Sequence, residues 1–273
     1  MLVLFLHLAS GNVSGARFGQ LTMVNSFPEY HADAINDGGY TSIVLGMDPV
    51  AYFPLNEASD NDPMLELRGQ TGQSHVNSPV YQHPGHVISG DSSKGVEYNG
   101  VNEYGDLLTL GTFGSGGVTA FTCIFWYRAS VTTTPGDMLG CSQSNNMAFR
   151  ILINYQNVSG RINLFCRDTL GNRLQGTNDQ PNINDGEFNL IHVEMITATS
   201  TINFRFNNAA QTISYLWQEA PSNFVDFTDS LMLGGARLNG TPSRFVNSAF
   251  SHLAFWNRVL TVRERQILKL GAV

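Results

Sequence analysis

Short stretches of alternating apolar and polar residues constrain this 273-residue chain more than any other feature. From Pro49 onward they recur about every ten residues, separated by clusters of Gly, Asn and Ser. In the stretch FTCIFWYRAS, one face of the expected strand carries Phe121, Cys123, Phe125 and Tyr127. Many short strands at this spacing predict an all-β fold, an antiparallel two-sheet sandwich. No sustained helical period competes with them before the C-terminal end.

The C-terminal segment is different, because its pattern predicts one short helix. Thr261 is a suitable N-cap residue, and Glu264 three positions later completes a capping box. An apolar stripe follows, made of Val262, Ile267, Leu268 and Leu270. Because so short a helix is marginal alone, we expect its stripe to pack on a preformed sheet.

Residues 1–47 are rich in Gly, Ser and Asn and show no sustained hydrophobic period. Such a segment cannot easily build a core of its own. We therefore divide the chain into an extended N-terminal arm, 1–47, and a β-sandwich domain, 48–273. The sequence YTSIVLGM near the end of the arm fits a short helical turn leading into the domain. The apolar residues expected to dock the arm on a surface during assembly are Phe18, Leu21, Met23 and Phe27.

Charge and cysteine content limit the partners that we expect. The net charge is −7 and no basic stripe is present to neutralise phosphates, so we expect no nucleic acid partner. Thirteen Arg stand against two Lys, a bias typical of protein interfaces, although a lineage bias gives the same pattern. Three cysteines without close spacing predict buried, reduced thiols. No stretch approaches the ~20 apolar residues of a membrane span and no basic leader region is present, so we expect neither a membrane partner nor a cleaved leader.

Five motifs carry a family resemblance through their order and spacing. They are PVAYFPLNEAS (49–59), VEYNGVNEYGDL (96–107), FTCIFWYR (121–128), DGEFNLIHVEM (185–195) and FSHLAFWNRVLTVRERQI (250–267). On these motifs the chain resembles the concanavalin A-like lectin/glucanase superfamily, in its laminin-G-like jelly-roll branch. The chain departs from the family pattern at several positions: Tyr98 stands where Phe is usual, Phe188 replaces the usual Trp, and only His192 of the usual His pair is retained. The resemblance implies a jelly roll in which Trp256 and Arg258 are a packed anchor and its partner.

The same superfamily includes glycoside hydrolases, so a catalytic role has to be considered. Their retaining mechanism needs two carboxylates roughly 5–5.5 Å apart, which on one strand means a spacing of two or four residues. None of the nine Glu is followed by Asp two positions later, and no nucleophile elbow or zinc-protease motif is present. We therefore expect no catalytic residues and no enzymatic activity.

Two segments hold candidate ligand-binding residues, one in a loop and one that leads into a loop. The sequence NEASDND supplies hard oxygen ligands that suit a calcium cofactor, namely Glu57, Asp60 and Asp62. An acidic loop that serves solubility alone is the alternative. The sequence ISYLWQEAPSNF supplies candidate glycan contacts, namely Tyr215, Trp217 and Asn223. Packing at the sandwich edge or against a subunit partner is the alternative for these residues.

Two functional hypotheses follow. The first is a non-enzymatic structural protein of a virus particle, such as a phage capsid decoration (cement) protein or a tail-associated protein. Its arm would bind other virion proteins, from capsid or tail, or copies of the chain itself. The alternative is a lectin-like attachment module that binds cell-surface glycans and is secreted or displayed on a particle. The first hypothesis places the protein in the virion, and the second also allows an extracellular location.

Overall fold

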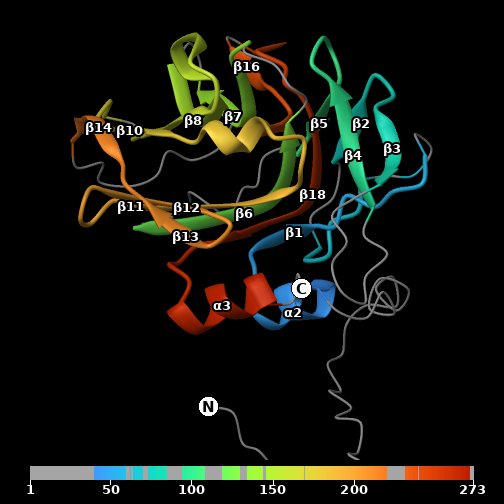
Figure 1. Ribbon diagram of the computed structural model, residues 1–273, viewed down its shortest axis with the longest axis horizontal. Helices are drawn as coiled ribbons and strands as arrows, with labels where there is room; N and C mark the ends of the chain where they lie inside the picture. Colours follow the sequence, from blue (N-terminus) through green and yellow to red (C-terminus); the bar gives the residue numbers. More distant parts are fainter. Residues whose placement is uncertain are drawn as a thin grey trace, which may run out of the picture.

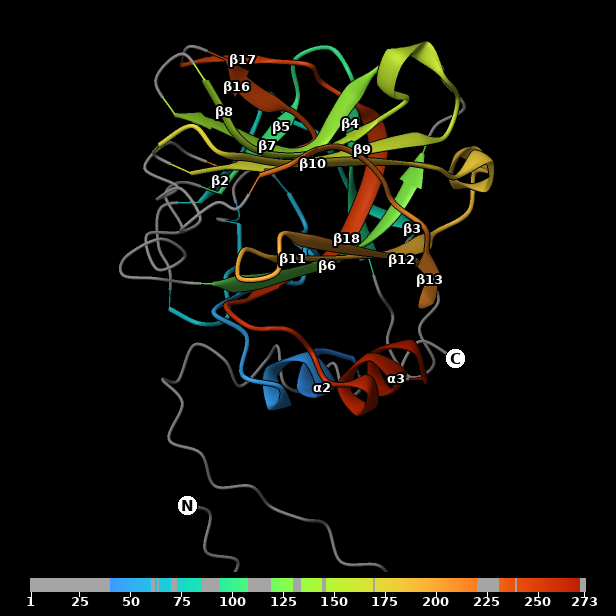
Figure 2. The ribbon, with the colours of Figure 1, turned by 90° about the vertical axis from the view of Figure 1, so that its left-hand side faces the viewer.

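The computed structural model describes residues 40–59, 62, 64–69, 73–84, 94–107, 119–129, 134–143, 146–168, 170–219, 231–238 and 240–270. Two antiparallel sheets stack face to face in these ranges, and two helices cover the outer face of one sheet (Figure 1, Figure 2). The predicted all-β jelly-roll sandwich with a short C-terminal helix is confirmed. None of the described helices is long and apolar enough to cross a membrane. The predicted assembly residues Phe18, Leu21, Met23 and Phe27 lie outside the described residues.

Sheet A is the middle layer, and sheet B lies on the side away from the helices (Figure 2). Sheet A runs in the order β13 (Ala209–Gln211), β12 (Thr201–Phe206), β11 (Asn189–Ile196), β6 (Ala120–Ala129), β18 (Asn247–Trp256), β4 (Lys94–Asn99) and β3 (Val80–Pro84), with β1 (Ala51–Phe53) paired to β18. Sheet B runs in the order β14 (Ser214–Gln218), β10 (Arg173–Asp179), β9 (Arg161–Arg167), β8 (Asn146–Ile153), β7 (Gly136–Gln143), β15 (Met232–Leu233), β5 (Tyr104–Asp106) and β2 (Ser74–Val76). The remaining elements are the hairpin β16 (Ala236–Leu238) with β17 (Thr241–Ser243), the 3₁₀ turns η2 (Tyr155–Asn157) and η3 (Pro181–Asn184), and the helices α2 (Tyr40–Gly46) and α3 (Val262–Leu270).

Strand β6 shows why the sequence pattern leads to three layers. Its predicted face from Phe121 to Tyr127 lies in the main core between the two sheets. Its other face buries Ile124 and Trp126 in a second apolar cluster, beneath the helices. A strand buried on both faces gives a nearly continuous apolar run, as this sequence does. The three cysteines, Cys123, Cys141 and Cys166, are free and buried in the main core, as predicted.

The C-terminal helix forms where the sequence predicts it. Thr261 N donates to Glu264 Oε2 (2.7 Å) and Glu264 N to Thr261 Oγ1 (3.2 Å), so the capping box is confirmed. Leu268 is buried in the second apolar cluster. Val262, placed in the same stripe from sequence, is instead 61% exposed. That assignment was wrong because at about 100° per residue Val262 and Leu268 lie about 120° apart around the helix.

Two residues of the motif FWNR, Trp256 and Arg258, connect sheet A to the helices. Trp256 is fully buried and its Nε1 donates to Met47 O (3.0 Å). Arg258 donates to the same carbonyl (2.8 Å) and to Glu264 Oε1 (2.7 Å), which ties α3 to the segment after α2. Both residues are therefore an anchor and its partner, as the resemblance implies. Helix α2, the expected turn near the end of the arm, buries Tyr40 against sheet A, so the fold already includes the last residues of the predicted arm.

Candidate functional site

The face of sheet B that points away from sheet A carries most of the polar and aromatic side chains considered below. On β9 the residues Ile162, Leu164 and Cys166 face the main core, so the alternate residues face outward. We call the surface formed by the outward residues of β8, β9, β10 and β14 the outer face. Strand register pairs the outward residues of β9 with those of β10 in four rows: Arg161 with Asp179, Asn163 with Thr177, Phe165 with Gln175, and Arg167 with Arg173.

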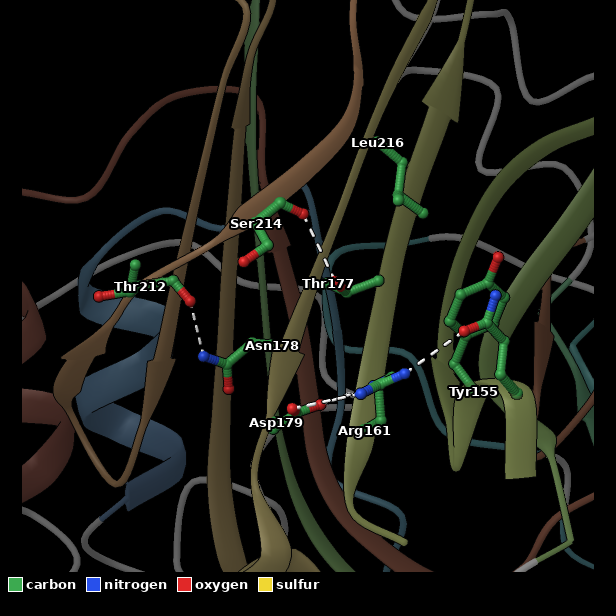
Figure 3. A pocket seen from close by; sticks show the side chains of 9 residues that line it. Tyr155, Arg161, Thr177, Asn178, Asp179, Thr212, Ser214 and Leu216 are labelled. Atoms are coloured by element: carbon green, nitrogen blue, oxygen red, sulfur yellow. Dashed lines mark hydrogen bonds and ion pairs between the residues drawn. The ribbon is translucent and has the colours of Figure 1, made fainter. Parts of the chain in front are cut away.

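A pocket of about 480 Å³ opens at one end of the outer face (Figure 3). This volume lies within the range of small-molecule binding sites. The lining comes from η2, β9, β10 and β14 and from the turn before β14. The lining residues are Tyr155, Gln156, Arg161, Thr177, Asn178, Asp179, Thr212, Ser214 and Leu216. Most of them are polar, so the pocket offers many hydrogen-bond donors and acceptors to a ligand.

Hydrogen bonds hold several lining side chains in fixed orientations, as Figure 3 shows. Arg161 Nε donates to Asp179 Oδ1 (2.6 Å), and its Nη1 donates to Gln156 Oε1 (3.3 Å). The hydrogen bond from Arg161 holds the pKa of Asp179 below its ordinary value, so Asp179 is ionised at neutral pH. Asn178 Nδ2 donates to Thr212 O (2.7 Å). The pocket therefore presents a preorganised pair of opposite charges.

Beside the pocket, the buried side-chain amide of Asn163 on β9 braces the outer face. Asn163 Oδ1 accepts from Arg150 Nε (3.1 Å) and Nη2 (2.9 Å) and from Gln175 Nε2 (3.1 Å). The Arg150 guanidinium also lies 5.9 Å from the ring centroids of both Tyr155 and Phe165. A satisfied network of this kind fixes the orientation of the side chains above it. The outer face is therefore a rigid surface rather than a set of loose side chains.

A β-bulge separates the two predicted aromatic contacts. The register between β10 and β14 shifts at Gln175/Gly176, so Tyr215 pairs with Gly176 while Trp217 pairs with Gln175 on the outer face. Tyr215 packs against the main core, and its hydroxyl accepts from Ile202 N (2.9 Å). Tyr215 is thus used inside the sandwich, and Trp217 is the exposed aromatic of the pair.

Trp217 stays accessible next to the pocket. Its side chain is 40% exposed, and Arg173 stacks on its ring with Cζ 4.3 Å from the ring centroid. Its neighbour Leu216, 47% exposed, lines the pocket. Asn223, the third predicted contact, lies outside the described residues.

The structure shows the contacts of two of the three predicted calcium ligands, Glu57 and Asp62. Glu57 is buried, its Oε1 accepts from Leu65 N (2.7 Å) and its Oε2 lies 3.3 Å from His75 Nε2. Asp62 Oδ2 instead accepts from the backbone of Ala58 and Ser59, both at 3.1 Å. The third ligand, Asp60, lies outside the described residues. Within the described ranges, no group of three or more His, Cys, Asp or Glu side chains is placed to hold a metal ion.

Sequence reasoning missed most residues of the pocket. The alternation in GRINLFCRD already indicated that Arg161 and Arg167 share a face, and this was the available signal. The contributions of Tyr155, Asp179 and Thr212 depend on how strands and turns come together.

No protein-family model and no curated protein matches this sequence. Several solved structures share its architecture. The binding domain of botulinum neurotoxin DC in complex with rat synaptotagmin II superposes with a TM-score of 0.59 at 8% identity, over 83% of this chain and 52% of that chain. The receptor-binding domain of botulinum neurotoxin type G gives 0.53 at 11% identity, over 81% of this chain and 50% of that chain.

A third structure concerns botulinum neurotoxin type C, whose cell entry depends on interaction with two ganglioside molecules. It gives a TM-score of 0.58 at 9% identity, over 85% of this chain and 53% of that chain. The chain therefore spans about half the length of each of these proteins. At such low identities the likeness shows the fold alone, a two-sheet β-sandwich.

Proposed function

We propose that this chain is a glycan-binding module, and that the outer-face pocket with the adjacent Trp217 is its binding site. The observation that carries the proposal is the combination of a polar pocket of about 480 Å³ with an exposed indole beside it. Sugars present hydroxyl groups at their edges and apolar C–H groups on their faces. Fixed polar groups such as Arg161 and Asp179 suit the hydroxyls, and an amphipathic aromatic ring suits the faces.

The structural neighbours are consistent with this proposal. One of these neurotoxin structures is a complex with rat synaptotagmin II, and another concerns interaction with two ganglioside molecules, so the fold serves protein and glycan recognition there. By analogy we propose that the partner of this chain is a cell-surface glycan. We also propose that the sandwich belongs to the laminin-G-like branch of the concanavalin A-like superfamily. Trp256 and Arg258 in the C-terminal motif (250–267) anchor the helices, which is the role that the resemblance implies for them.

We further propose that the site binds without catalysis. Among the described residues that line the pocket, Asp179 is the one carboxylate, and Arg161 holds it in an ion pair. A retaining glycosidase would need a second carboxylate roughly 5–5.5 Å away. The hypothesis of a virion protein, with capsid or tail partners and a virion location, stays a prediction, because it rests mainly on the arm.

The proposal is tested by glycan-array screening followed by titration calorimetry of the glycans that bind. We expect Arg161→Ala and Trp217→Ala each to weaken binding roughly 10-fold or more, since each removes a charge-assisted or stacking contact. Arg263→Ala is the matched control, because Arg263 is an exposed arginine on α3, on the opposite side of sheet A.

Circular dichroism of each variant checks that the sandwich is still folded. If no glycan binds, or if folded Arg161→Ala and Trp217→Ala proteins bind as tightly as the Arg263→Ala control, the proposed site is wrong.

A further inference from the structure

Two arginines face each other across strands at the other end of the outer face. Arg167 on β9 is the direct register partner of Arg173 on β10, and both belong to the outward set. Like charges directly opposite in an antiparallel pair disfavour each other. Burial, and then the neighbouring Arg173, hold the pKa of Arg167 below its ordinary value. This arrangement is unfavourable for the free protein and needs an explanation.

Two nearby carboxylates offset the positive charge of the pair only in part, because the charge of Asp168 does not restore the pKa of Arg167 to its ordinary value. Asp168 holds the β9–β10 turn, because its Oδ1 accepts from the backbone N of Leu170 and of Asn172, both at 2.9 Å. Glu219 Oε2 accepts from the backbone N of Arg173 (2.5 Å) and lies 3.6 Å from its Nε. Arg167 makes no side-chain hydrogen bond to any residue that the structure describes. Glu219 thus pairs with Arg173, whereas Asp168 acts on Arg167 through its charge without a described side-chain hydrogen bond to it.

An aromatic ring positions one of the two arginines. Arg173 stacks on Trp217, and this cation–π contact restricts where its guanidinium points. The same indole is 40% exposed beside the polar pocket. The arginine pair and the proposed sugar site therefore lie on one continuous surface.

We propose, on the basis of the proposed function, that Arg167 and Arg173 bind a carboxylate of the glycan, so that the ligand is an acidic oligosaccharide. A guanidinium matches a carboxylate with two parallel hydrogen bonds, which favours such a group over a neutral hydroxyl. The net charge of −7 repels acidic polymers in general, so a local pair of arginines selects where an acidic group docks. A sugar fits this surface better than an acidic peptide, because the pair lies beside an exposed indole and a polar pocket.

The spacing sets the size of this ligand. Arg161 in the pocket and Arg167 in the pair are six residues apart on β9, which corresponds to roughly 20 Å along a strand. A single sugar ring cannot reach both, so a ligand that contacts both ends contains several residues.

The test uses an array of uronate- and sialate-terminated oligosaccharides, each beside its carboxyl-reduced product. The full-length chain is compared with Arg167→Gln, Arg161→Ala and the α3 control Arg263→Gln. We expect carboxyl reduction to weaken binding to the wild-type protein roughly 10-fold or more. Arg167→Gln weakens binding of the acidic form by a similar factor and leaves the reduced form unchanged. Raising the salt concentration weakens binding of the acidic form more than binding of the reduced form.

Three results overturn the inference, and they differ in what they say about the proposed function. Equal binding of acidic and reduced glycans, still dependent on Arg161, refutes the acidic ligand and leaves the glycan module intact. No binding to any glycan refutes both. Binding of a polyglutamate peptide that Arg167→Gln abolishes, without acidic glycan binding, shows that the pair recognises a protein instead.

Discussion

The buried carboxyl group of Asp137 on β7 predicts how the free energy of unfolding depends on pH. Its side chain is fully buried, and both carboxylate oxygens lack a hydrogen-bond partner in the described part of the chain. Arg244 Nε lies 4.0 Å away, at the outer limit of an ion pair, and donates no hydrogen bond to it. Burial therefore outweighs the attraction of Arg150 and Arg244 and raises the pKa of Asp137 from 3.8 to about 7.

The sign and size of the effect follow from proton linkage. Between about pH 4 and pH 7 the folded protein keeps a proton that the unfolded chain releases, so the free energy of unfolding falls as pH rises. The whole shift from 3.8 to about 7 corresponds to roughly 4 kcal/mol at 1.36 kcal/mol per pKa unit. Of this, roughly 2.5 kcal/mol is lost between pH 5 and pH 8.

The perturbation is Asp137→Asn, which replaces the carboxyl by a neutral amide of nearly the same shape. Urea unfolding of both proteins at several pH values from 5 to 8 gives the free energy of unfolding directly. We expect the stability of Asp137→Asn relative to wild type to increase by roughly 2.5 kcal/mol across this range. Other titrating groups, such as His192, cancel in the difference. Parallel pH profiles for the two proteins would show that the pKa of Asp137 is not raised in the folded protein.

Two further predictions concern local structure. Gly234 has φ +77° and an added Cβ would lie 2.5 Å from Tyr98 Cδ2, so Gly234→Ala should cost about 3 kcal/mol or more in unfolding free energy. Gly186→Ala, at φ +81° with open space around it, is the control and should cost only about 1–2 kcal/mol; equal costs would show that the Tyr98 contact does not matter. Thr261→Ala should cost about 1 kcal/mol in thermal or urea unfolding, because it removes the N-cap of α3, whereas Thr261→Ser should cost less than half of that. A Thr261→Ala protein as stable as wild type would mean that α3 contributes little to the fold.

Local patterns were sufficient to predict much of the fold. Alternation identified both faces of β6, and the spacing of Thr261 and Glu264 identified the start of α3, because both signals depend on residues close in sequence. The motif around Trp256 and Arg258 indicated an anchor, and the structure confirms its contacts.

The candidate site was less predictable because it depends on strand pairing. Asp179 reaches Arg161 through the register of β10 on β9, which no local pattern specifies. The bulge beside Gly176 turns Tyr215 inward and leaves Trp217 outside, although both belong to one apolar stretch. Glu57 was predicted in an open acidic loop, but it contacts His75, which is distant in sequence.

We propose that the outer face of sheet B binds a glycan. The most direct test of this proposal is backbone amide NMR of the labelled full-length chain during titration with the glycan that binds most tightly on the array. We expect the amide shifts to change at Thr177, Asp179, Ser214 and Trp217 and to stay constant along α3. Shifts confined to α3 or to the outer edge of sheet A, or no shifts with any array glycan, would contradict the account.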